Sequence, residues 1–241
     1  MNGPEPSARV VLVTGAAGGL GRALVAAFAA RGWHVAAAHH RATTHVETGS
    51  VWPLPLDVTD GARAEEVVRE ITARWGRLDA FIHNAGLTAD APLPQLGDES
   101  WDRVLAVNLK GAFLCARAAL RPMLRQRDGH IVSVASFSGR AGARGQAHYA
   151  AAKAGLFGLT QSLAREAGAR NVRVNAVLPG VLPTRMTAGL TAEQMAAFAA
   201  ANVLGRINAA EEVAEFIVFL AGMRNVSGQC FQLDSRIAPW T

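Results

Sequence analysis

The chain has few cysteines, one tyrosine and no long apolar run. Its apolar stretches fall short of the roughly 18 residues that a membrane-spanning helix needs, so we expect no membrane partner. Cys115 and Cys230 form neither a CxxC motif nor a disulfide framework. This favours a reducing cytoplasm and predicts two core thiols. The start, MNGPEPSARV, lacks the charged-then-apolar pattern of a secretory signal, so we expect residues 1–8 to form a disordered tail.

Motifs for metal binding, hydrolysis and nucleic-acid recognition are missing as well. The histidines show no HExxH or paired-ligand spacing, so no catalytic metal is indicated. Ser136 is not in a G-x-S-x-G elbow, which disfavours hydrolase chemistry. The formal net charge is +5, but there is no basic run and no interleaving with aromatic residues. The charge therefore argues against nucleic acid and favours an anionic cofactor or an acidic partner.

Short strand-like runs alternate with longer helical patterns along the chain. Runs such as VVLV and AFIH are apolar throughout, which is typical of parallel strands covered by helices on both faces. The predicted strands are Arg9–Thr14, His34–His39, Val51–Leu56, Leu78–His83, His130–Ala135, Val172–Leu178 and Cys230–Leu233. The predicted helices are Gly19–Ala30, Gly61–Trp75, Ser100–Gln126, Tyr149–Ala169 and Ala210–Ala221. The alternation predicts an α/β fold: a single Rossmann-type domain over residues 9–241, with about seven strands in a doubly wound parallel sheet.

A glycine-rich turn directly follows the first predicted strand. Residues 14–21 read TGAAGGLG and open a helix. Glycines at such a turn let backbone N–H groups approach a pyrophosphate, and the helix N-terminus favours its negative charge. A tight left-handed turn would give the same letters, but the position after the first strand favours dinucleotide binding. The candidate cofactor residues are Thr14, Gly15, Gly19, Leu20 and Gly21.

The end of the second predicted strand bears on which dinucleotide binds. An acidic residue there would hold the ribose hydroxyls of NAD. The strand instead leads into His40 and Arg41, which suit the 2′-phosphate of NADPH. We therefore predict NADPH, with NADH possible because Gly18 stands where a second basic side chain would strengthen the case. The alternative is that His40 and Arg41 are ordinary solvated loop residues. The following spacer, TTHVETGS, predicts a crossover without a helix.

Seven motifs, taken in order, resemble the short-chain dehydrogenase/reductase family over residues 9–233. They are TGAAGGLG at 14–21, LDV at 56–58, HNAG at 83–86, VNLKG at 107–111, Ser136, YAAAK at 149–153, and Pro179-Gly180 with Thr184. The chain departs from the family pattern in the helix-free crossover after the second strand. It also departs in ending Leu233-Asp234-Ser235-Arg236, where the family often has a double glycine.

The resemblance implies a role for each motif at a bound cofactor. The residues that would contact it are Asp57 and Val58 at the adenine, Asn84, Ala85 and Gly86 beneath the cofactor, Tyr149 and Lys153 at the nicotinamide ribose, and Pro179, Gly180 and Thr184 at the carboxamide. By the same resemblance Asn108 would hold a water that links Lys153 to solvent. The alternative for Asn108 is a polar residue that bends a helix at a packing contact.

The side chains of Ser136, Tyr149 and Lys153 suit the reduction of a ketone. A carbonyl that accepts hydride becomes an alkoxide, and Tyr149 can supply the proton that it needs. Lys153 lies one helical turn later, on the same face. A charge about 5 Å away is worth roughly 3 kcal/mol at an effective dielectric near 20, so we expect Lys153 to lower the pKa of Tyr149. Ser136, at a strand end, can stabilise the developing oxyanion.

Within the family, the stretches GQAHYAAAKAGL and SLARE resemble 3-oxoacyl-[acyl-carrier-protein] reductases most closely. This implies NADPH-dependent reduction of a carrier-bound 3-oxoacyl thioester. Arg127 and Arg170 would dock an acidic acyl carrier protein beside the cleft, although arginines there would also complement helix dipoles. The alternatives are a reductase of another ketone, such as a polyketide, sugar or secondary metabolite, and a dinucleotide sensor without turnover.

Two further expectations follow from the same resemblance. Residues 181–207 would form a mobile lid over an apolar substrate tail, although amphipathic packing explains the same residues. The helices predicted at Ser100–Gln126 and Tyr149–Ala169 would pair between subunits to form a homotetramer.

Overall fold

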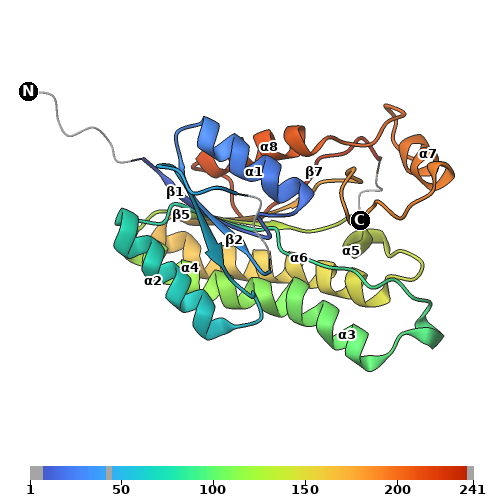
Figure 1. Ribbon diagram of the computed structural model, residues 1–241, viewed down its shortest axis with the longest axis horizontal. Helices are drawn as coiled ribbons and strands as arrows, with labels where there is room; N and C mark the ends of the chain where they lie inside the picture. The colour runs from blue at the N-terminus through green and yellow to red at the C-terminus, as the bar shows by residue number, and fades with distance from the viewer. Residues whose placement is uncertain (1–7, 42–44, 238–241) are drawn as a thin grey trace, which may run out of the picture.

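A computed structural model describes residues 8–41 and 45–237 and arranges them around one parallel sheet (Figure 1). The strands are β1 (Val10–Thr14), β2 (His34–His39), β3 (Val51–Pro55), β4 (Ala80–His83), β5 (Gly129–Val134), β6 (Val172–Leu178) and β7 (Cys230–Gln232). The α-helices are α1 (Gly19–Ala30), α2 (Gly61–Trp75), α3 (Asp98–Leu105), α4 (Gly111–Gln126), α5 (Ser138–Ala141), α6 (Ala147–Ala167), α7 (Ala192–Ala200) and α8 (Ala210–Gly222). The strand order is β3-β2-β1-β4-β5-β6-β7, with every neighbouring pair parallel. The predicted seven-stranded, doubly wound sheet is confirmed.

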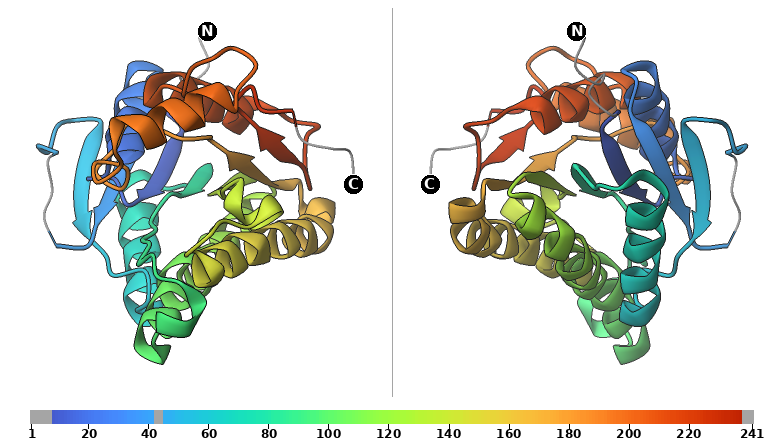
Figure 2. Two further views of the ribbon diagram at one scale, coloured as in Figure 1. Left: turned by 90° about the vertical axis from the view of Figure 1, so that its right-hand side faces the viewer. Right: turned by 90° about the vertical axis from the view of Figure 1, so that its left-hand side faces the viewer.

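Helices cover both faces of the sheet, as Figures 1 and 2 show. α1 and α8 lie on one face, and α2, α4 and α6 lie on the other. Side chains alternate along each strand, so Val11 and Val13 of β1 pack into the first layer and Val10 and Leu12 into the second. This double coverage accounts for strands that are apolar at every position.

Strand β3 closes one edge of the sheet and carries two prolines. Pro53 and Pro55 stand opposite Ala37 and His39 of β2, the only strand with which β3 pairs among the described residues. Proline has no N–H to donate, so these positions offer fewer backbone donors to another chain. The edge is thereby protected against pairing with a second sheet.

The strand order reverses between β1 and β4, and this reversal sets the location of the site. From β1 the chain winds outward through β2 and β3, and from β4 it winds the opposite way through β5, β6 and β7. Parallel sheets bind ligands in the crevice beyond the carboxyl ends of their strands at such a reversal. Strands β1, β4, β5 and β6 end at Thr14, His83, Val134 and Leu178, which brings the predicted motifs to one edge.

The long helix predicted over Ser100–Gln126 is divided in the structure. α3 ends at Leu105, a π-helical turn spans Ala106–Lys110, and α4 begins at Gly111. The Gly111 N–H donates to the carbonyl of Ala106, five residues earlier. Such widened turns occur frequently at functional sites. Asn108, a poor helix former, lies in the middle of this one.

Several predicted features differ in the structure or lie outside the described residues. The short helix α5 and the helix α7, which lies within residues 181–207, were not predicted. Cys115 is buried as expected, but Cys230 is partly exposed and is not a core thiol. Residues 45–50 contain no helix, whereas 42–44 and most of the predicted tail over 1–8 lie outside the described residues. No helix of the described chain is long and apolar enough to cross a membrane.

Candidate active site

The glycine-rich turn after β1 is held rigidly by the end of β4. Gly15 has a φ of +65°, and a Cβ there would lie 2.8 Å from the Cα of Ala85. The Asn84 amide donates to the carbonyl oxygens of Thr14 and Gly15 at 3.2 and 3.1 Å. The Thr14 hydroxyl, fully buried, accepts from the backbone N–H groups of Asn84 and Ala85. Thr14, Asn84 and Ala85 thus fix the turn from its protein side. The backbone N–H groups of the turn are left to face a ligand.

The N-terminus of α1 is open to an anion. Its first turn contains Gly19, Leu20 and Gly21, its N-cap Gly18 makes no side-chain cap, and no acidic residue lies in that turn. The first N–H groups of a helix have no partner within the helix, and the helix dipole favours negative charge at this end. The turn and the helix start therefore fit the pyrophosphate of a dinucleotide.

The ends of β2 and β3 supply the groups at the predicted adenosine position. The His40 imidazole lies 3.3 Å from the carboxylate of Asp57, and Arg41 is exposed beside it. Asp57 accepts from the N–H and hydroxyl of Thr59, and these bonds with nearby His40 outweigh burial, so the pKa of Asp57 lies below its usual value. Val58 belongs to the core, which leaves its main chain to meet a ligand.

A histidine that sequence reasoning missed also reaches this region. His45, in the segment between β2 and β3, places its Nε2 2.9 Å from the carbonyl oxygen of Ala16 in the glycine-rich turn. The polar sequence TTHVETGS gave no basis for predicting this contact. Residues 45–50, which contain no helix, are therefore tied to the cofactor turn through His45.

Ser136, Tyr149 and Lys153 come together at the carboxyl ends of β5 and β6. The Ser136 side chain interacts with the Tyr149 hydroxyl, and the Lys153 Nζ lies 5.6 Å from the centre of the Tyr149 ring. Lys153 is 4 % exposed and donates to the carbonyl of Val134 at 2.7 Å. Burial lowers the pKa of Lys153 to about 8. One face of α6 thus presents a phenol with a buried amine beneath it.

The expected lowering of the Tyr149 pKa is not seen, and the reason is burial. Desolvation of the phenolate raises the pKa of Tyr149 above its ordinary value, and the nearby carboxylate of Asp90 raises it further. The hydrogen bond with Ser136 acts in the opposite direction but is outweighed. Without a ligand, Tyr149 is therefore held in its protonated, proton-donating form.

Asn108 faces Lys153 across a space that only glycine leaves open. Its Nδ2 donates to the carbonyls of Leu87 and Val104 at 2.8 and 2.9 Å, so both amide hydrogens are used. Its Oδ1 is buried without a hydrogen-bond partner among the described residues. A Cβ on Gly86 would lie 2.7 Å from that oxygen and 3.5 Å from the Lys153 Nζ. A water or a sugar hydroxyl placed there would satisfy both groups.

A polar network connects the rim of the site to the start of α6. The Ser138 hydroxyl donates to the Gln146 carboxamide oxygen at 3.0 Å, and the Gln146 Nε2 donates to Asp90 at 2.8 Å. The Ala91 N–H donates to the carbonyl of Gly145 at 2.9 Å. Sequence reasoning gave none of these residues a role, although Gln146 lies within the GQAHY stretch that carries the family resemblance.

The segment after β6 reaches back over the glycine-rich turn. Gly180, after Pro179, has a φ of +78°, and a Cβ there would lie 2.6 Å from the Cβ of Asp234. A Cβ on Gly19 would lie 2.6 Å from the Thr184 methyl. Thr184 is thus in position to meet a ligand seated between these two loops.

Arg127 and Arg170 are not beside this cleft within one chain. Arg127 precedes β5 and Arg170 precedes β6, so both lie at the amino edge of the sheet. The two loops adjoin, because the Asn171 side chain donates to the carbonyl of Arg127 at 3.0 Å. Ser136 follows the far end of β5, about 20 Å further along at roughly 3.3 Å per residue. The expectation that these arginines flank the cleft is therefore wrong for a single chain.

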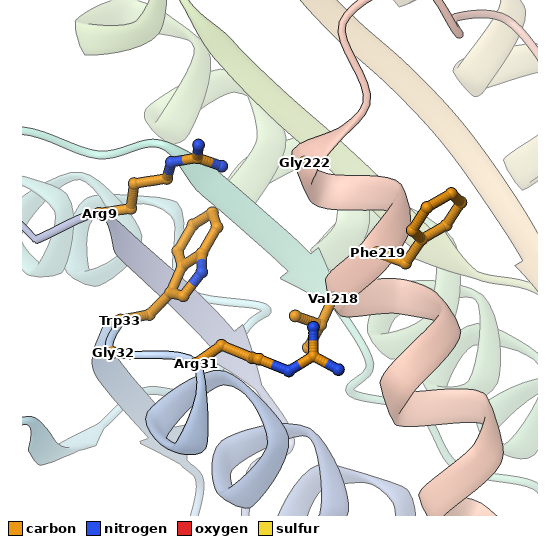
Figure 3. Close-up of a pocket in the computed structure, with 7 residues that line it drawn as sticks. All are labelled: Arg9, Arg31, Gly32, Trp33, Val218, Phe219 and Gly222. Atoms are coloured by element: carbon orange, nitrogen blue, oxygen red, sulfur yellow. The ribbon is translucent and has the colours of Figure 1, made fainter.

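Two hollows on the described part of the chain lie apart from the catalytic groups. One of about 380 Å³ is at the amino edge of β1 and β2, where Arg9 lies against the Trp33 ring and Arg31 and Phe219 border the opening (Figure 3). The other, of about 320 Å³, is lined by residues of α6 and the loop before β7, including Arg165 and Ser227. Neither contains a residue of the Ser136–Tyr149–Lys153 group.

Comparison with known proteins places this geometry in a family. The model of the short chain dehydrogenase family matches residues 9–195. The 3-oxoacyl-[acyl-carrier-protein] reductase FabG of Thermotoga maritima is 40% identical over 94% of this chain and 96% of its own length. FabG of Escherichia coli is 40% identical over 88% of this chain and 89% of its own length. The Synechocystis 3-oxoacyl-[acyl-carrier-protein] reductase is 36% identical over 95% and 96%.

Solved structures agree with the sequence relatives. The structure described as ElxO with NADP bound superposes with a TM-score of 0.87 at 25% sequence identity, covering 95% of this chain and 98% of its own. The order of motifs, the sheet topology and the matched relatives confirm the resemblance seen in the sequence. The chain belongs to the short-chain dehydrogenase family and is an oxidoreductase that acts on a keto group.

Proposed function

We propose that this chain uses NADPH to reduce a 3-oxoacyl thioester, carried by an acyl carrier protein, to the 3-hydroxyacyl product, with Tyr149 as general acid. The observation that carries the proposal is the placement of Ser136 and Tyr149 together above the buried amine of Lys153, whose Nζ lies 5.6 Å from the Tyr149 ring centre. The identity of about 40% to 3-oxoacyl-[acyl-carrier-protein] reductases over nearly the whole chain supports this substrate class. A sensor would need the nucleotide site but not this acid.

Each catalytic side chain has a distinct task in the reduction. NADPH, when bound, supplies the hydride. Ser136 donates a hydrogen bond to the substrate carbonyl oxygen and stabilises the negative charge that develops there. Tyr149 transfers its proton to that oxygen, and the Lys153 ammonium beneath the ring stabilises the phenolate that remains. Asn108 Oδ1 faces Lys153 and holds a water that can return a proton to the amine.

Residues on both sides of the reversal in strand order, between β1 and β4, would hold the cofactor. The glycine-rich turn and the start of α1 fit the pyrophosphate, and Gly86 leaves room for the nicotinamide ribose beside Lys153. Arg41 and His40 suit a 2′-phosphate at the end of β2, and the similar structure of ElxO, which has NADP bound, supports that choice. His40 already pairs with Asp57, so we assign the larger share of the phosphate to Arg41.

The protein should oxidise NADPH in the presence of an acetoacetyl thioester, and NADH much more slowly. An ion-paired hydrogen bond to phosphate is worth about 1.5–3 kcal/mol, so Arg41→Ala should lower kcat/KM for NADPH about tenfold or more and spare that for NADH. Absorbance of the reduced nicotinamide measures both rates. Arg69→Ala, at an exposed arginine of α2, is the charge-matched control. A wild-type preference for NADH would refute the assignment of Arg41.

Replacement of Tyr149 by Phe should abolish reduction while sparing cofactor binding. The loss of the proton donor above Lys153 should lower kcat by about 10²–10⁴-fold, the usual worth of general acid catalysis. The dissociation constant for NADPH, followed by nicotinamide fluorescence, should stay within a few-fold of the wild type. Substantial residual turnover in Tyr149→Phe would exclude Tyr149 as the acid.

Asp90→Asn should lower the pKa of Tyr149, because it removes a negative charge that disfavours the phenolate. Tyr149 is the only tyrosine in the chain, so tyrosinate absorbance reports this one group in the free protein. Oxidation of the 3-hydroxyacyl product needs the phenolate as base, so the rate of this reverse reaction rises with pH. In the variant the rise should occur at lower pH. Asp98→Asn, in the first turn of α3, is the control, and equal shifts in both variants would contradict the assignment.

Arg127 and Arg170 remain our candidates for carrier docking, at the amino edge of the sheet. A carrier bound there lies far from the Ser136 of the same chain, so productive delivery would require the site of a neighbouring subunit. We expect that neighbour in a homotetramer built on α4 and α6. Phe113 of α4, 43% exposed with Arg117 over its ring, is an apolar group suited to such an interface. We expect the assembly in the cytoplasm.

Arg127→Glu should raise KM for the carrier-bound substrate about tenfold, because reversal of a rim charge slows association with an acidic partner. Turnover of the free thioester should be unchanged. Arg69→Glu alters the net charge equally at an exposed position of α2 and should leave both substrates unaffected. Equal losses on carrier-bound and free thioester would count against docking at Arg127.

A further inference from the structure

His83 is a buried histidine at the end of β4 that the mechanism above does not use. It is 0% exposed and lies between the cofactor turn and the π-helical turn. Its Nε2 is 3.3 Å from the carbonyl oxygen of Asn108, and its Nδ1 is 3.5 Å from the Thr14 hydroxyl. The ring, at the end of β4, thus lies between Thr14 of β1 and the π-helical turn and contacts both.

The partners of His83 determine its tautomer. A main-chain carbonyl can only accept, so the Nε2 that faces Asn108 must carry the hydrogen. Nδ1 is then an acceptor 3.5 Å from the Thr14 hydroxyl, whose single hydrogen also has the carbonyl oxygen of Ile82 within reach at 3.3 Å. Burial, aided by the positive charge of Lys153, lowers the pKa of His83 to about 3, so the ring is neutral at ordinary pH. His83 is a hydrogen-bonding support in this state and carries no charge.

The bond from His83 acts on the residue that faces Lys153. In the π-helical turn both the main chain and the side chain of Asn108 are fixed, the former by His83 and the latter by Leu87 and Val104. With both amide hydrogens committed, Oδ1 has to point into the space beside Gly86 and Lys153. The His83 bond fixes the carbonyl of the same residue, so its loss would let the Asn108 main chain shift and carry Oδ1 with it.

We infer that His83 is a positioning residue of the reduction, holding the Asn108 main chain so that Oδ1 keeps a water against Lys153. The inference rests on the proposed function. After Tyr149 has given its proton to the substrate oxygen, a proton from solvent must restore the Lys153–Tyr149 pair. His83 sets the path of that proton without itself gaining or losing one. Its Thr14 contact links this path to the rigid cofactor turn.

The test compares His83→Phe, which keeps a ring but removes both nitrogens, with His83→Gln, whose Nε2 can still donate to Asn108. With acetoacetyl thioester and NADPH, His83→Phe should lower kcat about fivefold to tenfold, the worth of one hydrogen bond, and enlarge the solvent deuterium isotope effect on kcat. The NADPH dissociation constant should change less than about twofold. His83→Gln should recover most of kcat and the wild-type isotope effect.

His130 offers a matched control. It is equally buried, lies at the amino end of the neighbouring strand β5, and accepts from the Asn175 amide at 2.7 Å. His130→Phe should reduce stability without altering the isotope effect. An unchanged isotope effect in His83→Phe, an equal change in His130→Phe, or no recovery in His83→Gln would each overturn the inference.

A second measurement separates this inference from the proposed function. Nitrogen NMR of histidine-labelled free protein, with the His83 signal assigned by its absence in His83→Gln, reports the tautomer without substrate. A neutral ring with hydrogen on Nε2 is expected, and hydrogen on Nδ1 would overturn the inference whatever the protein reduces. Failure of the wild type to turn over any 3-oxoacyl thioester would instead refute the proposed substrate.

Discussion

The buried amine of Lys153 is the constraint on which the rest of the site depends. An ammonium removed from water is strongly disfavoured unless hydrogen-bond acceptors replace its hydration. The protein supplies one acceptor, the carbonyl of Val134 at the end of β5, and aims a second, Asn108 Oδ1, at the same space. The lowered pKa of Lys153 reflects this incomplete solvation. Its remaining donors are therefore available to a ligand that brings hydroxyl groups.

Small residues let the backbone approach closely enough for this arrangement. A Cβ on Gly139 would lie 2.6 Å from the backbone nitrogen of Ala154, so α6 can pack against α5 only because that side chain is missing. A Cβ on Gly86 would fill the space between Asn108 and Lys153. The many alanines and glycines of the sequence thus favour helices and also allow close backbone contacts around Lys153.

Residue types and their spacing in the sequence predicted the sheet and the Tyr149–Lys153 pair. They did not predict properties that depend on burial or on the distance between residues in the folded chain. The strand–helix alternation gave the sheet, and the spacing of Tyr149 and Lys153 placed them on one helical face. The pKa of Tyr149 went the other way from expectation, because a charge can be read from a sequence but desolvation cannot. Arg127 was misplaced for a related reason. Arg127 and Ser136 are close in sequence, but they lie at opposite ends of β5.

The C-terminal departure from the family pattern illustrates how a substitution can couple two loops. Where the family often has a double glycine, this chain has Ser235 and Arg236 after Asp234. The Asp234 side chain is almost fully buried, packs against Gly180 and pairs with Arg236, whose guanidinium lies 4.0 Å above the Phe137 ring. Phe137 follows Ser136 directly, and Gly180 belongs to the loop predicted to meet the carboxamide. The pair at Asp234 and Arg236 thus contacts both loops, and a glycine at position 236 could not make the contact with the Phe137 ring.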